Sequence, residues 1–240
     1  MAYGLYIMIN THFAQNCGII GGILTLYGFY VYGKDSFSGD AKPAKAGWII
    51  WAIVTFLTMI SYISSTTAAH PLEMVYRTVE LGMQNPAIFF AVANFIGCAV
   101  VAAIAFWKGK KGWTFTDKLC LLCAGVSVAI WYLSGSALIG LCITLVADFI
   151  GAIPTIKHAL EEPHDESKHA WLVFSIGTAV SLFGVSKLEF EELVFPIYFV
   201  FIDSIIASLV LVESQNFWLR RKVCGFMESL AMLGRLFAAT

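Results

Sequence analysis

Two aspartates interrupt long apolar stretches of this sequence, and they are the residues best suited to chemistry. Asp148 and Asp203 both lie well inside segments made otherwise of apolar and small residues. If those segments cross a bilayer, an ionised carboxylate at the centre costs about 2.5–3.5 kcal/mol even on a lenient insertion scale, so both side chains should face a protein interior or water. Each aspartate therefore marks either a functional site or a hydrogen bond that holds neighbouring helices together.

Asn94 lies at a similar depth in another apolar stretch and can be paired with Asp203. Two polar groups that face each other at mid-membrane could hold the hydroxyls or amides of a solute, and Asp203, unlike Asn94, could also exchange a proton. Tyr62 and Ser181 are further candidates for lining the same cavity and binding substrate. The alternative for such hydroxyls is a bond to a carbonyl of their own helix.

Asp148 lies at the same depth in its apolar stretch as Thr25 does in an earlier one, and Gly151 and Pro154 follow it. Proline removes the backbone hydrogen bond to the carbonyl four residues earlier, which weakens the helix there. A bend beside an acidic side chain would suit a rocking gate, so these four residues are candidates for coupling or gating. The alternative is that Pro154 simply ends the helix.

The composition places these residues in a membrane protein. The 240 residues are 59% hydrophobic and 13% charged, whereas a soluble domain has about 25% charged residues. A net charge of -1 offers no basic surface for nucleic acid. The Cys120-x-x-Cys123 pair lies in an apolar run without a second pair, so packing explains it better than a metal site, and no cofactor is expected.

A bilayer core needs roughly 20 apolar residues of helix. Six such stretches are evident, at 14–33, 47–65, 86–107, 137–156, 170–185 and 193–212. The 38 residues from 119 to 156 carry one charge and would make a helix about 57 Å long, so we expect a break at Ser134-Gly135-Ser136 and a seventh span before it. Seven spans place thirteen of the fifteen Lys and Arg residues on one side, which predicts a cytoplasmic C-terminus and an outside N-terminus.

The chain also contains an internal repeat. A shift of 123 residues matches five positions without a gap, namely Ile20 with Ile143, Gly28 with Gly151, Lys34 with Lys157, Lys45 with Lys168 and Trp48 with Trp171. The alternative is that interfacial Lys and Trp are common to any membrane hairpin, but identical spacing at five positions without a gap favours a repeat. We expect an all-α integral membrane protein of seven transmembrane helices, arranged as two parallel three-helix-bundle repeats joined by a connector helix.

In this architecture residues 1–112 form the first repeat, 113–136 the connector and 137–213 the second repeat. Within the first repeat, the segment 70–85 has one apolar and one charged face and should lie in the membrane interface on the outside. The segment 214–240 mixes aromatic residues with Arg and Lys and is expected to be a basic interfacial tail. The loop from 157 to 169 is expected to be solvated, because its histidines and acids follow no regular spacing for a metal.

The stretch 138–185 carries a Gly shortly before a Pro, then a polar loop with Lys, then another apolar helix. In this it resembles a PQ-loop hairpin of the SWEET, PQ-loop and PnuC-type transporter group. Thr155 stands where that group has Gln after the Pro, and the residues near Ile60 and Phe183 are not the Trp expected of sugar carriers. The resemblance implies a uniporter or proton-coupled carrier of a small solute.

Three functions are therefore compared. The first is a transporter of a small polar solute, which is not an enzyme. Its expected partners are that solute and the lipid bilayer of a bacterial inner membrane, and the transporter could form a homo-oligomer. The second is a receptor or scaffold that binds a ligand without moving it. The third, an intramembrane hydrolase with Asp148 and Asp203 as an aspartyl dyad, lacks the surrounding motif of such enzymes.

Overall fold

The protein is built from α-helices. The computed structural model describes residues 2–67, 71–109, 112–113 and 115–211, and none of these residues lies in a β-strand. The helices are α1 (Ala2–Ser38), α2 (Lys45–Thr67), α3 (Pro71–Gln84), α4 (Ala87–Lys108), α5 (Phe115–Ser134), α6 (Ala137–Glu161), the short 3-10 turn η1 (Pro163–Asp165), α7 (Lys168–Leu182) and α8 (Phe190–Leu211). The expected basic tail at 214–240 lies outside the described residues.

Several helices are long and apolar enough to cross a membrane. Within the described residues, five meet both conditions by length and composition, namely α2, α4, α5, α6 and α8. α7, with 15 residues, is shorter than the roughly 20 residues that a span needs, whereas α1 has 37 residues. The chain is therefore an all-helical integral membrane protein.

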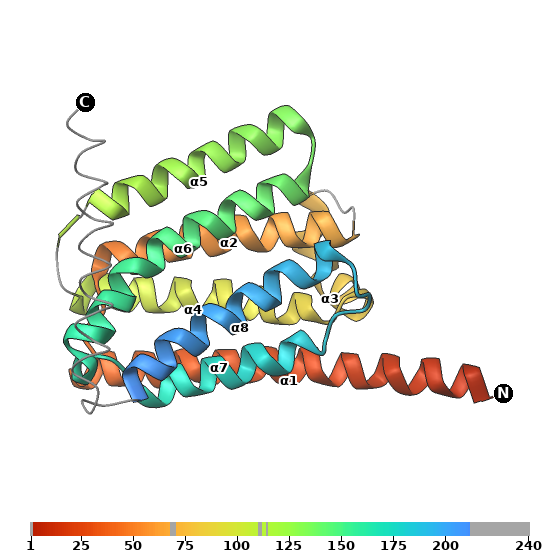
Figure 1. The fold of residues 1–240 in the computed structure, drawn as a ribbon, viewed down its shortest axis with the longest axis horizontal. Helices are drawn as coiled ribbons and strands as arrows, with labels where there is room; N and C mark the ends of the chain where they lie inside the picture. The colour runs from red at the N-terminus through yellow and green to blue at the C-terminus, as the bar shows by residue number, and fades with distance from the viewer. Residues whose placement is uncertain (1, 68–70, 110–111, 114, 212–240) are drawn as a thin grey trace.

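The break expected in the long apolar run is confirmed. α5 ends at Ser134 and α6 begins at Ala137. Gly135 has a φ of 65°, which favours glycine, and the Ser136 hydroxyl caps α6 by accepting the Ile139 amide hydrogen. Elsewhere the boundaries differ: α1 starts well before the expected 14–33 span, and its N-terminal part extends beyond the other helices (Figure 1).

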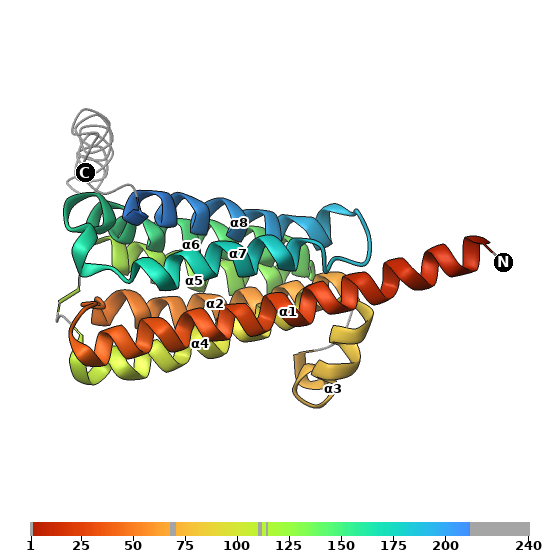
Figure 2. The ribbon, with the colours of Figure 1, turned by 90° about the horizontal axis from the view of Figure 1, so that it is seen from below.

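The helices pack as two adjoining groups. α4 contacts both α1 and α2, and in the same way α8 contacts both α6 and α7. The groups meet where α1 packs on α7 and α2 packs on α6, while α5 contacts α6 and α2 at the periphery. Figure 2 shows α1, α2 and α4 in one layer and α6, α7 and α8 in the other.

Small residues allow α1 and α7 to approach closely. A Cβ added to Gly21 would lie 2.1 Å from Ser181 Oγ and 2.9 Å from the Gly177 carbonyl oxygen. A Cβ on Gly177 would in turn lie 3.0 Å from Thr25 Oγ1. Such contacts are how membrane helices gain close packing in the absence of a hydrophobic force between them. They hold Thr25 at a fixed place in the junction between the two layers.

The bundle has two distinct ends. The loops 39–44 and 162–167 gather at one end with the C-terminus of α4 and the N-terminus of α5, and we call this the lysine-rich end. α3, the 135–136 turn and the 183–189 loop lie at the other, which we call the α3 end (Figure 1). α3 occupies the segment 70–85 that was expected to be helical and amphipathic. Its Tyr76, Val79 and Met83 are exposed, and its Arg77 pairs with Glu73 and Glu80, so the helix carries both apolar and charged side chains on its surface.

Candidate functional site

A small cavity lies midway along the bundle, between the two layers. Its volume is about 40 Å³, room for roughly three water molecules. Helices of both layers contribute its polar lining, which consists of Thr25, Thr55, Asn94, Cys98, Asp148 and Asp203. The rest of the lining is apolar and mostly aromatic.

Four of the eight predicted site residues meet in this cavity. Asn94 of α4 and Asp203 of α8 both line it, and each belongs to the helix that packs between the other two of its layer. Asp148 of α6 and Thr25 of α1 line it as well. The Thr25 hydroxyl donates to the Gly21 carbonyl oxygen of its own helix at 2.9 Å, so a solute could use only its oxygen lone pairs.

The two aspartates differ in their partners. Tyr198 donates its hydroxyl hydrogen to Asp148 Oδ2 at 2.6 Å. Asp203 accepts no hydrogen bond from any residue that the structure describes. Sequence reasoning missed Tyr198, because a tyrosine in an apolar helix carries no signal of the helix that it faces.

Tyr62 and Ser181 do not line the cavity. Tyr62 lies near the α3 end, where its hydroxyl donates to the Glu192 carbonyl oxygen at 3.1 Å and accepts from Asn85 Nδ2 at 3.2 Å. Ser181 lies in the junction of α1 and α7 and donates to the Gly177 carbonyl oxygen at 2.9 Å. The structure therefore does not bring these two residues together with the other polar groups.

A second cavity opens on the lysine-rich side of the first. It has a volume of about 250 Å³, and Trp48 and Trp51 belong to the lining of both cavities. The two indole rings lie 5.0 Å apart between their centroids and are nearly perpendicular, so they form a wall between the cavities. We call the larger space the vestibule.

Gly151 and Pro154 line the vestibule and not the central cavity. A Cβ on Gly151 would lie 3.2 Å from Trp51 Nε1, so this glycine leaves room for the indole. α6 continues past Pro154 to Glu161, and the interpretation that this proline ends the helix is therefore wrong. The proline lies inside a helix that borders the vestibule, which keeps the gating interpretation open.

An aromatic cluster closes the cavity on its other side. Tyr62, Phe90, Phe195 and Phe199 are each at most 6% exposed. Phe195 is central, with ring centroids 4.6 Å from Tyr62, 5.2 Å from Phe90 and 5.0 Å from Phe199. The cavity is thus bounded by aromatic rings toward both ends of the bundle.

The polar loop at 157–169 is more ordered than expected. Glu166 and Ser167 are buried, and they bond to side chains of α1 in the other layer and of α7 in their own. Trp171 Nε1 donates to Glu166 Oε2 at 2.9 Å, and the Ser167 hydroxyl donates to Asp35 Oδ2. The prediction of a solvated loop is wrong here, because these side chains close the lysine-rich end of the junction.

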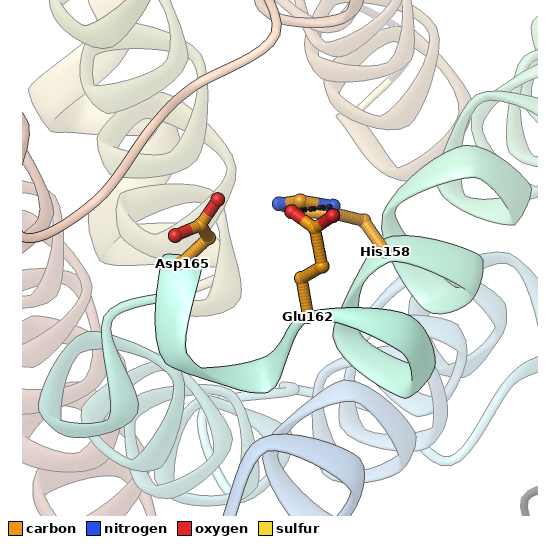
Figure 3. A group of neighbouring side chains, drawn as sticks. All are labelled: His158, Glu162 and Asp165. Atoms are coloured by element: carbon orange, nitrogen blue, oxygen red, sulfur yellow. Dashed lines mark ion pairs between the residues drawn. The ribbon is translucent and has the colours of Figure 1, made fainter.

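His158, Glu162 and Asp165 form a cluster beside this loop, drawn in Figure 3. Their ligand atoms lie within 4.8 Å of one another, and His158 Nδ1 lies 4.0 Å from Glu162 Oε2. Lys42 Nζ lies 2.7 Å from Asp165 Oδ1. The hydrogen bond and charge of Asp165 raise the pKa of Lys42. Since an ammonium group already compensates this carboxylate, we interpret the cluster as an ion-pair network between the two layers.

No family model, curated protein or solved structure matches this chain. The function is therefore argued from the cavity itself.

Proposed function

We propose that this protein is a transporter that carries a small polar solute across the membrane through the central cavity. The observation that carries the proposal is the position of Asn94, Asp148 and Asp203 in one cavity at the middle of a helical membrane bundle. Intramembrane acids are costly, and they commonly mark substrate, ion or proton pathways. The resemblance to the SWEET, PQ-loop and PnuC-type group leads to the same expectation.

The proposed architecture is seven spans in two parallel repeats, with residues 113–136 as the connector. The matching contacts support it: the third helix of each group packs between the first two, and the first helix of each packs on the second helix of the other. Such exchange of equivalent contacts is what a two-fold axis along the membrane normal would produce. The peripheral position of α5 suits a connector.

Alternating access would use the two aromatic boundaries as gates. Trp51 is the better candidate for a moving part of the inner gate, because its buried Nε1 has no hydrogen-bond partner among the described residues. Rotating this ring would break no such bond and would join the cavity to the vestibule. Trp171, in contrast, is held by Glu166. The outer gate would be the cluster around Phe195.

The carrier is either a uniporter or coupled to protons through Asp203. A carboxyl group without a fixed partner can hold a proton on one side of the membrane and release it on the other. The titratable groups around it are Asp148 on α6, Tyr198 on α8 and Cys98 on α4. Asp148 is the second candidate for this role.

The test is uptake into proteoliposomes that contain the purified full-length protein. A panel of labelled amino acids, sugars, nucleosides and amines is offered, and uptake is compared with that of protein-free vesicles. Asn94→Ala should reduce uptake at every pH, and Asp203→Asn should remove its pH dependence if the carrier is proton-coupled. Asp40→Asn, an exposed loop aspartate, is the matched control.

Binding of a solute without uptake would favour a receptor or scaffold instead. Cleavage of an offered peptide that depends on both aspartates would favour the hydrolase. The proposed orientation is tested by single cysteines at positions 40 and 80, which lie at opposite ends of the bundle. Labelling of both from the same side would refute it.

A further inference from the structure

The central cavity is lined by two carboxyl groups, and no positive side chain among the described residues lines it to balance them when they ionise. Asp148 and Asp203 both line it, and the described residues of its lining include no Lys, Arg or His. Tyr198 donates one hydrogen bond to Asp148 but carries no positive charge. Burying an uncompensated charge is strongly destabilising, so something outside the fold must balance this cavity when its carboxylates are ionised.

Two polar side chains in the cavity also lack protein partners. Asn94 is 7% exposed, and among the described residues it forms no hydrogen bond through its amide group. Asp203 is partly buried and accepts none from the described residues either. Buried polar groups are usually paired with protein or an ordered ligand, so each such exception needs an explanation. Both groups line the cavity and are free to contact a bound molecule.

The remaining surface is aromatic. Seven rings line the cavity, Trp48, Trp51 and Phe174 among them. An aromatic face attracts a cation, with tryptophan the strongest, and the attraction grows when the site excludes water. Aromatic rings and carboxylates together recognise a positive charge carried on an apolar body.

We propose that the solute is a small organic cation, an amine or quaternary ammonium compound, whose nitrogen lies beside Asp203 and whose carbon atoms pack against the tryptophan rings. The inference rests on the transport function proposed above and names its substrate class. An anion would meet two carboxylates and no basic group. A sugar would find few hydrogen-bond donors, because the hydroxyls of Thr25 and Thr55 already donate to carbonyls of their own helices.

The size of the cavity requires a movement when the cation binds. About 40 Å³ cannot enclose a molecule of several heavy atoms, whereas the adjoining vestibule offers about 250 Å³. Displacement of Trp51 joins the two spaces and leaves its indole face available to the cation. Binding is therefore expected to depend on Trp51 as well as on Asp203.

Binding is measured on the full-length protein in detergent, by calorimetry and thermal shift. The probes are choline and its neutral isostere 3,3-dimethyl-1-butanol, then butylamine and pentanol, all at constant ionic strength. We expect at least one cation to bind about tenfold or more tightly than its isostere, equivalent to about 1.4 kcal/mol. Asp203→Asn should remove this preference, while Asp203→Glu and Asp40→Asn should retain it.

Equal affinity for cations and their isosteres, or no binding of any cation, would overturn the substrate class. So would a preference that Asp203→Asn leaves unchanged in a variant whose gel-filtration profile and helix content match the wild type. The two proposals fail separately: cation binding without uptake would leave the class standing and refute transport. Uptake of a neutral solute that no cation inhibits would do the reverse.

Discussion

Replacing Asp203 by asparagine tests whether the fold itself stabilises the carboxylate charge of Asp203 or whether a bound group must compensate it. Asparagine has nearly the same volume but cannot ionise. Asp203 accepts no hydrogen bond from the described residues, and it shares one small cavity with Asp148, whose charge would repel its own. The substitution therefore removes a cost and breaks no described contact.

The size of the effect follows from the cost of the charge. An aspartate at the centre of a membrane helix costs about 2.5–3.5 kcal/mol on the insertion scale. Part of this is already relieved by the cavity, and asparagine is itself polar, so we expect a gain of about 1–3 kcal/mol in unfolding free energy. For a chain of this length each kcal/mol corresponds to a shift of about 2–4 °C in Tm. Asp203→Asn should therefore raise Tm by several degrees.

The assay is thermal unfolding in detergent without added solute, followed by tryptophan fluorescence. Tyr198→Phe is the comparison, because it removes the 2.6 Å hydrogen bond to Asp148 and should have the opposite sign. Its expected cost is about 1–3 kcal/mol, the penalty for leaving a buried polar group unpaired. If Asp203→Asn lowers Tm as much as Tyr198→Phe does, the fold itself stabilises the Asp203 carboxylate and no ligand is needed to compensate it.

Three further predictions concern the gate, the helix junction and the lysine-rich end. Trp51→Ala should open the wall between the central cavity and the vestibule. The rate at which a thiol reagent labels Cys98, a buried residue of the central cavity, should then rise by about tenfold, as measured by mass spectrometry. An unchanged labelling rate would show that the Trp51 indole is not the barrier between the two cavities. Gly21→Ala should cost about 1–3 kcal/mol through overpacking, whereas Gly125→Ala, with nothing within 4 Å of the added Cβ, should be neutral or slightly stabilising in the same unfolding assay. Lys42→Gln should lower Tm at neutral pH. Because the ion pair raises the pKa of Lys42, the difference in Tm from wild type should disappear as the pH rises past the ordinary lysine pKa of about 10.4 and through this raised value. A difference in Tm that persists at high pH would mean that packing, and not the ion pair, causes it.

The sequence alone determined the class of protein and the approximate positions of most of its helices. Apolar runs of membrane length can be satisfied in lipid only as helices, so the main spans could be predicted from residue order. The break between α5 and α6 followed from the excessive length of one run and its three small residues. Asn94, Asp148 and Asp203 were recognisable because a polar group in such a run is costly wherever it points.

Tertiary structure decided which of these residues meet. A helix presents each side chain in a direction fixed by its own geometry, but the partner that it faces depends on how distant helices pack. That packing joined Tyr198 to Asp148, placed Tyr62 and Ser181 away from the cavity, and made Trp48 and Trp51 a wall between two spaces. It also buried Glu166 in a loop whose charged composition predicted solvent exposure. The costly polar groups could be found locally, whereas their partners lie far away in the chain and only the folded bundle identifies them.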